Sequence, residues 1–162
     1  MITIRDALDS DAAAIAMLTV ELGYEADREA IQSRLARLKG RGDHKVVVAL
    51  EEEKIVGWMQ VHASDVLESG FRAEIVGLVV SERSRRRGVG RSLVSRAEQW
   101  AVEIGAEAIV VRSNTKRVES HSFYPALGFT SSKTQAVYRK QLKKGPNQAP
   151  PTSGRRPAAA QL

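Results

Sequence analysis

A run of arginines and glycines joins a strand-like segment to a helix-like segment near the middle of the chain. Residues 71–80 are mostly apolar, as is typical of a strand, and residues 88–104 carry apolar side chains at helical spacing. Between them lies the sequence Arg85-Arg86-Arg87-Gly88-Val89-Gly90-Arg91-Ser92. The free amides and positive dipole end at the start of a helix attract anions, and glycines let an anion approach the backbone. Because arginines bind phosphate oxygens through charge-assisted hydrogen bonds, this segment predicts a phosphate or pyrophosphate site.

Two familiar phosphate-binding loops do not fit this segment. The P-loop requires the pattern GxxxxGK[ST], which the sequence lacks. The dinucleotide-binding fingerprint requires a third glycine at the position where Leu93 stands. The pattern that remains is R-x-x-G-x-G, which taken alone also fits a solvent-exposed loop that caps a helix.

Helix-like and strand-like segments alternate along most of the chain. Strands are expected at residues 2–8, 46–50, 55–63, 71–80 and 108–112, from residue 129 onward, and at 135–142. Helices are expected at residues 10–22, 27–38, 88–104 and 114–127. Gly77 lies inside a strand-like run, where a glycine often marks a bulge or a close backbone contact. The mixture predicts a mixed sheet flanked by helices, in the α/β or α+β class.

Charge and proline are unevenly distributed. The formal net charge is +6, but residues 143–162 contain four basic residues and no acidic one, which leaves +2 for residues 1–142. Four of the five prolines also lie beyond residue 145. We therefore expect residues 1–142 to form one domain and residues 143–162 to form a basic, proline-rich, disordered tail.

Residue types that are missing or scattered exclude several classes of protein. The chain has no cysteine, which excludes disulfide scaffolds, thiolate metal sites and a cysteine nucleophile. Its three histidines show no metal-ligand spacing, so no metal is expected. The chain lacks both an apolar run of about 18 residues and a signal-peptide pattern, so a cytoplasmic protein without a membrane partner is expected. No aromatic residue stands among the arginines of residues 83–91, so no nucleic-acid partner is expected either.

A second informative segment lies downstream, with the sequence Ser120-His121-Ser122-Phe123-Tyr124-Pro125-Ala126-Leu127-Gly128-Phe129. The order of R-x-x-G-x-G after a strand, Asn114 after the next strand, and then this segment resembles the GNAT superfamily of N-acetyltransferases. The resemblance covers about residues 2–142 and implies a small, single-domain enzyme that uses acetyl-CoA. It also implies a mostly antiparallel sheet of about seven strands, a splay between the fourth and fifth strands, and about four flanking helices.

The same resemblance implies a set of site residues. The pantetheine arm of acetyl-CoA would insert at the splay and bond the backbone of Leu78, Val79 and Val80, while Asn114 would contact the same region. Tyr124 would lie near the sulfur of acetyl-CoA, and Glu74 would act as the general base. The pyrophosphate would be held by Arg85, Arg86, Arg87, Gly88, Val89, Gly90, Arg91 and Ser92.

The chemistry of acetyl transfer sets requirements that these residues can meet. A lysine-type amine has a pKa near 10, so it is mostly protonated at pH 7 and cannot attack a thioester. A base such as Glu74 must remove that proton, and the hydroxyl of Tyr124 could return one to the departing thiolate. Because the chain has no cysteine, direct attack in a ternary complex of acetyl-CoA and the amine is the simplest route.

Each assignment has an alternative that the sequence leaves open. Glu74 could be an outward-facing strand residue paired with an arginine, Tyr124 a packed aromatic, and Asn114 a helix cap. The whole chain could be a catalytically silent, acyl-CoA-binding regulatory domain, or a nucleic-acid-binding module that uses the arginine cluster. The acceptor could be an aminoglycoside-type or other cationic small amine, or a peptide or protein amine. The protein could act as a homodimer or as a monomer.

Overall fold

The central sheet of the computed structural model, which describes residues 1–143, has five strands in the order β1-β2-β3-β4-β5. Neighbouring strands from β1 to β4 are antiparallel, and β5 runs parallel to β4. Their bounds are β1 Ile2–Asp6, β2 His44–Glu51, β3 Lys54–Val66, β4 Gly70–Val80 and β5 Ala108–Val111. The arrangement confirms the mixed α/β class.

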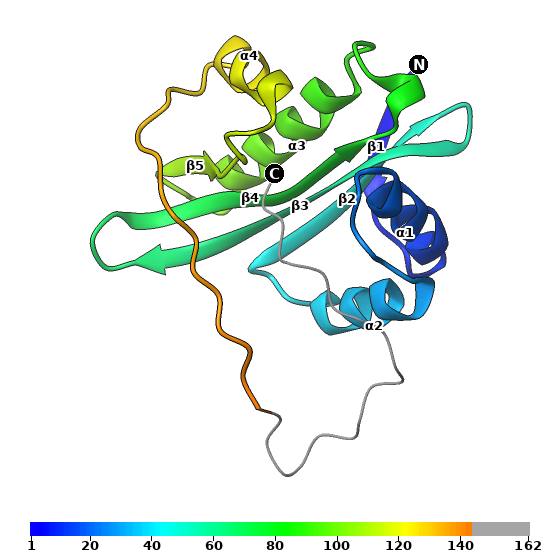
Figure 1. Ribbon diagram of the computed structural model, residues 1–162, viewed down its shortest axis with the longest axis horizontal. Coiled ribbons are helices and arrows are strands. Elements are labelled where there is room, and N and C mark those ends of the chain that lie inside the picture. The colour runs from blue at the N-terminus through cyan, green and yellow to red at the C-terminus, as the bar shows by residue number, and fades with distance from the viewer. Residues whose placement is uncertain (144–162) are drawn as a thin grey trace.

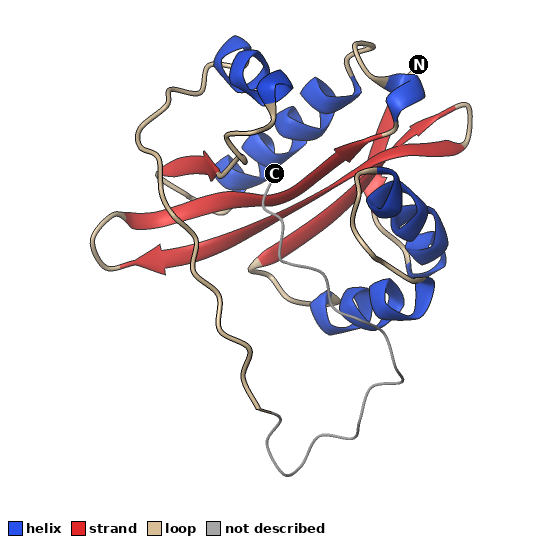
Figure 2. Ribbon diagram, viewed as in Figure 1, coloured by secondary structure: helices blue, strands red, loops and turns tan. Residues whose placement is uncertain are grey.

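Helices cover both faces of this sheet (Figures 1 and 2). The first pair, α1 (Ala12–Glu21) and α2 (Arg28–Leu38), lies on one face, and the second pair, α3 (Val89–Glu103) and α4 (Val118–Ala126), lies on the other. Two short 3-10 turns, η1 (Asp9–Asp11) and η2 (Glu82–Ser84), precede α1 and α3. Within residues 1–143, every helix is too short or too polar to cross a membrane.

The main core lies between the sheet and α3. Val47, Met59 and Val61 of the sheet and Leu93 and Ala97 of α3 are fully buried in one apolar cluster. The apolar period of 3.6 residues along α3 places its buried side chains on one face, and their removal from water holds the helix on the sheet. The apolar face of α3 therefore fixes where its N-terminus stands relative to β4.

Strand β4 is paired along its full length on one edge and only in part on the other. Against β3, the register shifts by one residue at Val76, between the pairs Val61↔Ile75 and Gln60↔Gly77. Against β5, pairing covers only Arg72 to Ile75. Residues 76–80 therefore have no strand partner on the β5 side within the described chain. This geometry agrees with the bulge expected at Gly77 and with the splay expected between the fourth and fifth strands.

The expected sheet of about seven strands is wrong. Residues 129–143, which were expected to supply two strands, form neither strand nor helix. The β5 edge that they would join is four residues long, so few ladder hydrogen bonds could be gained there. Residues 131–135 are all polar, and Val137 and Tyr138 are 70% and 93% exposed, so little apolar burial holds the segment. Of the tail expected at residues 143–162, all but Lys143 lies outside the described residues.

The hairpin between β2 and β3 generates a prediction about stability. Its turn residues Glu52 and Glu53 have φ values of 48° and 64°, which cost a residue with a Cβ about 1–2 kcal/mol each. Turns of this kind favour Asn-Gly. Glu52→Asn combined with Glu53→Gly should therefore raise the free energy of unfolding in urea by about 1 kcal/mol. Replacing both glutamates with glutamine removes the same charges but keeps the strain, and equal stabilisation by that control would contradict the backbone explanation.

Candidate active site

The start of α3 has the free backbone amides that the predicted anion site requires. Gly88 precedes the helix with a φ of +86°, and the amide of Ser92 makes the first helical bond, to the Gly88 carbonyl at 3.0 Å. The three amides from Val89 to Arg91 therefore have no partner inside the helix. A Cβ at Gly88 would meet no atom within 4 Å, so the backbone angle, rather than crowding, favours glycine here.

The arginines of this loop differ in what they contact. Arg87 pairs with Glu51, with 2.6 Å between Nη2 and Oε1, and the Nε of Arg85 donates to the carbonyl of Val80 at 3.4 Å. By contrast, Arg86 and Arg91 form no ion pair with any residue from 1 to 143. These two guanidinium groups can bind an anion without giving up an ion pair.

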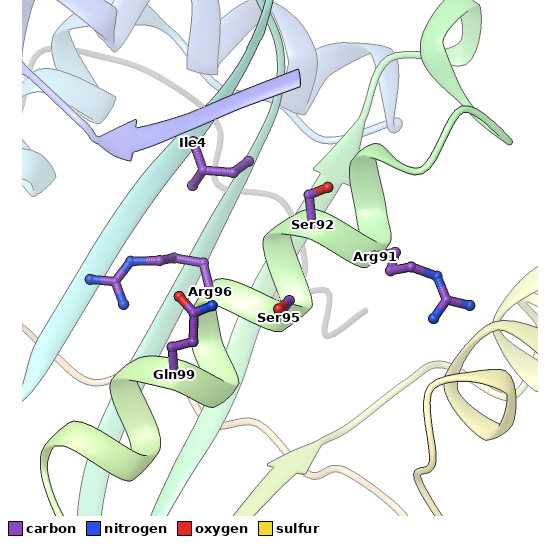
Figure 3. A pocket seen from close by; sticks show the side chains of 6 residues that line it. All are labelled: Ile4, Arg91, Ser92, Ser95, Arg96 and Gln99. Atoms are coloured by element: carbon purple, nitrogen blue, oxygen red, sulfur yellow. The ribbon is translucent and has the colours of Figure 1, made fainter. Parts of the chain in front are cut away.

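An open surface hollow of about 480 Å³ lies beside the same helix (Figure 3). Its position separates it from the splay, because Ile4 on its wall belongs to β1, at the opposite edge of the sheet from β5. Figure 3 shows the Arg91 side chain extending away from that of Arg96. The residues that line this hollow are Ile4, Arg91, Ser92, Ser95, Arg96 and Gln99.

The end of β4 presents a free backbone edge next to this helix. Leu78 and Val79 are buried, and on one edge they pair with Met59 and Trp58 of β3. The opposite edge is the one that β5 leaves open. An extended ligand can add to such an edge through main-chain hydrogen bonds, as an additional strand does.

Glu74 is almost fully buried among three basic side chains. Its carboxylate lies 2.8 Å from the Nη1 of Arg112 and 3.7 Å from the Nη2 of Arg72, and the Nε2 of His62 is 4.0 Å away. The side chain is only 6% exposed. The pairing with an arginine, which the sequence left open, is therefore present, but the alternative of an outward-facing residue is wrong because the side chain is buried.

Tyr124 approaches the splay from the other face of the sheet. Its ring packs against Phe123 and Phe129 at 5.0 and 5.6 Å between centroids, and it joins the apolar cluster on the α3 side. Ala73 and Ile75 belong to the same cluster, so Glu74, which alternates with them along β4, points to the opposite face. Burial raises the pKa of Tyr124 from its ordinary value of 10 to about 12, so its hydroxyl stays protonated even at mildly alkaline pH.

Asn114 organises a turn instead of starting a helix. Its Oδ1 accepts a hydrogen bond from the amide of Lys116 at 3.0 Å, and α4 begins four residues later, at Val118. The helix start expected at residue 114 is therefore wrong, because the side chain satisfies a local amide in a turn. The alternative of Asn114 as a cap of that helix is wrong for the same reason.

Two contacts near the splay were missed by sequence reasoning. The Nη2 of Arg117 donates to the hydroxyl of Tyr24 at 2.8 Å, which joins the segment before α4 to the α1–α2 loop. The carboxylate of Glu21 accepts from the amide of Glu82 at 2.7 Å, which ties the end of α1 to the turn after β4. The partners are 93 and 61 residues apart, so only folding brings them together.

A comparison with protein families identifies a match to the acetyltransferase (GNAT) family over residues 10–129. An aminoalkylphosphonate N-acetyltransferase of Salmonella typhimurium is 31% identical over 72% of this chain and 73% of its own length. An aminoglycoside N(6')-acetyltransferase of Serratia marcescens is 29% identical over 46% of this chain, and a rice acetyl transferase is 32% identical over 59% of it. The chain spans 51% and 26% of the lengths of these last two relatives.

Known structures show the same fold. A transcriptional regulator from Bacillus halodurans superposes with a TM-score of 0.79 and 25% identity, and the match covers 86% of this chain and all of that one. An aminoglycoside N-acetyltransferase in complex with CoA superposes with a TM-score of 0.77 over 88% of this chain and 96% of its own, at 17% identity. Because the family match spans most of the residues that build this fold and site, the chain belongs to the GNAT family of acetyltransferases.

Proposed function

We propose that this protein is an N-acetyltransferase that moves an acetyl group from acetyl-CoA to a primary amine by direct attack in a ternary complex. One observation carries the proposal. The pairing of β4 with β5 stops at Ile75, so residues 76–80 offer a backbone edge without a strand partner, and this edge leads to the unpartnered amides at the start of α3. A narrow, extended group that carries a diphosphate at one end fits this combination. The pantetheine arm of acetyl-CoA, with its diphosphate, has that shape and charge.

Acetyl-CoA would be held mainly by backbone groups. The amides of the pantetheine arm would bond the free edge at Leu78, Val79 and Val80, and the diphosphate would accept from the amides of the first turn of α3. Arg86 and Arg91 would add charge at the diphosphate, while Arg85 and Arg87 would hold the loop in shape through Val80 and Glu51. Asn114 would support the site by holding the turn before α4.

The two proton-transfer groups would act from opposite faces of the sheet. Glu74 would accept a proton from the ammonium group of the acceptor on the α1–α2 face. The amine would then attack the carbonyl carbon of the thioester, and the C–S bond would break as the tetrahedral intermediate collapses. Tyr124, whose pKa of about 12 lies well above neutral pH, would donate its proton to the departing thiolate on the α3–α4 face, and the second proton of the attacking nitrogen would return to the Tyr124 oxygen as the amide forms. Attack and departure would thus occur on opposite sides of the acyl carbon.

The acceptor would be a small amine. The relatives that support this are named for aminoglycosides and aminoalkylphosphonates, which share an aliphatic primary amine. The alternative of a silent, regulatory acyl-CoA-binding domain gains some support from the transcriptional regulator of the same fold. An assay of thiol release with acetyl-CoA and a panel of small amines tests the proposal: amine-dependent release supports the enzyme, and tight acetyl-CoA binding without any release supports the silent domain.

The proposed diphosphate site can be tested at Gly88. Gly88→Val should weaken acetyl-CoA binding, measured by calorimetry, by at least about 10-fold, because a side chain at a positive φ shifts the amides that receive the diphosphate. Gly105→Val is a matched control, since Gly105 also has a positive φ and open space and stands just beyond the other end of α3. Both variants should lose similar stability, and equal losses of affinity would contradict the assignment.

Removal of the proposed base should slow the chemical step. Glu74→Gln keeps the shape of the side chain and should lower kcat by about 10²–10⁴-fold while acetyl-CoA affinity stays nearly constant. Arg112→Gln breaks the same 2.8 Å ion pair but keeps the carboxylate, so it should retain far more activity. If both variants lose the same activity in a thiol-release assay, the ion pair matters rather than the base.

The proposed acid can be tested by kinetics and by titration. Tyr124→Phe should lower kcat, and an acyl donor with a more acidic thiol should restore part of the loss, because a better leaving group needs less protonation. In ultraviolet titration, Tyr124→Phe should remove the step near pH 12. Because unfolding lowers this pKa toward 10, the wild type should lose stability between pH 10 and 12, and the variant should lose less. An equal loss of activity with every donor would indicate a packing role.

A further inference from the structure

Three titratable side chains stand side by side across three neighbouring strands. His44 of β2 is the register partner of His62 of β3, and His62 is the register partner of Glu74 of β4. Side chains of directly opposed residues lie on the same face of a sheet, a few ångströms apart. The row therefore runs across the α1–α2 face, from the carboxylate beside the splay toward β2.

Exposure to solvent changes along this row. The side chain of Glu74 is 6% exposed, whereas that of His62 is 31% exposed. The Nε2 of His62 lies 4.0 Å from the Oε2 of Glu74, and the other carboxylate oxygen is occupied by Arg112 at 2.8 Å. His62 is thus the partly exposed neighbour of a carboxylate that has little direct contact with water.

The proton balance of amide formation makes such a neighbour useful. An ammonium group loses two protons when it becomes an amide, and the departing thiolate takes up only one of them. The second proton must reach solvent in every turnover, or the base remains protonated and the next acceptor cannot be activated. A carboxyl that is almost fully buried needs a group that carries this proton away.

We propose, on the basis of the proposed function, that His62 takes the acceptor-derived proton from Glu74 and releases it to solvent. The O–H bond on Oε2 of Glu74 breaks as an N–H bond forms on Nε2 of His62, and the resulting imidazolium then loses a proton to water. A shift of about 1 Å brings the two atoms from 4.0 Å to hydrogen-bonding distance. Glu74 returns to the carboxylate that Arg112 and Arg72 contact.

The neighbouring histidine, His44, does not oppose this short-lived charge. The rings of His44 and His62 meet edge to face, with 5.5 Å between centroids. Burial lowers the pKa of His44, so this neighbour is neutral at pH 7 and does not repel an imidazolium on His62. The Nδ1 of His44 lies 3.5 Å from the Nε2 of Gln60, and its Nε2 lies 3.8 Å from the Oδ2 of Asp43. Gln60 and Asp43 thus flank the two ring nitrogens of His44.

The experiment compares steady-state kinetics of the wild type and His62→Gln at low buffer concentration. His62→Gln should lower kcat roughly 10–100-fold, with little change in KM for either substrate, because only proton removal is impaired. Added imidazole should restore kcat in a concentration-dependent way, since a small base can carry the same proton. His121→Gln, which replaces an exposed histidine on α4, is the matched control and should behave as the wild type at every imidazole concentration.

A second measurement separates the relay from a structural role. Because His62 acts through Glu74, adding His62→Gln to Glu74→Gln should cause no further loss of kcat, whereas a packing defect would add its own loss. An active wild type whose His62→Gln variant is equally fast, or is slow without any response to imidazole, refutes the relay alone. A wild type that releases no thiol with any amine refutes the proposed function and the relay with it.

Discussion

The ladder between β3 and β4 is the interaction on which the rest of the structure depends. It runs from Val66↔Gly70 to Gly57↔Val80, and the two strands pack so closely that a Cβ on Gly57 would lie 2.8 Å from the carbonyl oxygen of Val79. Because one edge of β4 is bonded along its whole length, the other edge can stay open beyond Ile75 without loss of the strand. In most sheets an unpaired strand edge promotes aggregation. In the proposed function, the pantetheine arm of acetyl-CoA would bond this edge of β4.

The proposed reaction follows from the two faces of that strand. Alternation along β4 sends Glu74 toward the α1–α2 face, while its neighbours pack with Tyr124 on the α3–α4 face. A thioester held at the open edge would lie between a base on one side and an acid on the other. The proton that the base collects would then leave through His62, on the same face as Glu74, because Glu74 itself is 6% exposed.

Structural features that depend only on a few neighbouring residues were predictable from the sequence. The start of the helix expected at residues 27–38, the bulge beside Gly77 and the glycine before α3 all depend on local hydrogen bonds or backbone angles. The two strands expected after residue 129 failed because strand formation there requires a long partner edge, and β5 has only four residues. The pairing of Arg87 with Glu51 was not predictable either, since it joins residues 36 apart in sequence.

The sequence alone determined the order of elements as far as α4, the family resemblance and the residue types at the candidate anion site, because periodicity, caps and motif order are properties of neighbouring residues. Tertiary structure decided which charged groups meet. The register of the β2–β3 hairpin places His44 beside His62, and the register of the β3–β4 hairpin places His62 beside Glu74. Each register can be estimated from the sequence by counting residues back from the turn. Each of these two strand pairs contains a register irregularity, however, and a one-residue shift moves every following side chain to the other face. The surroundings of Glu74 therefore became visible only in the folded chain.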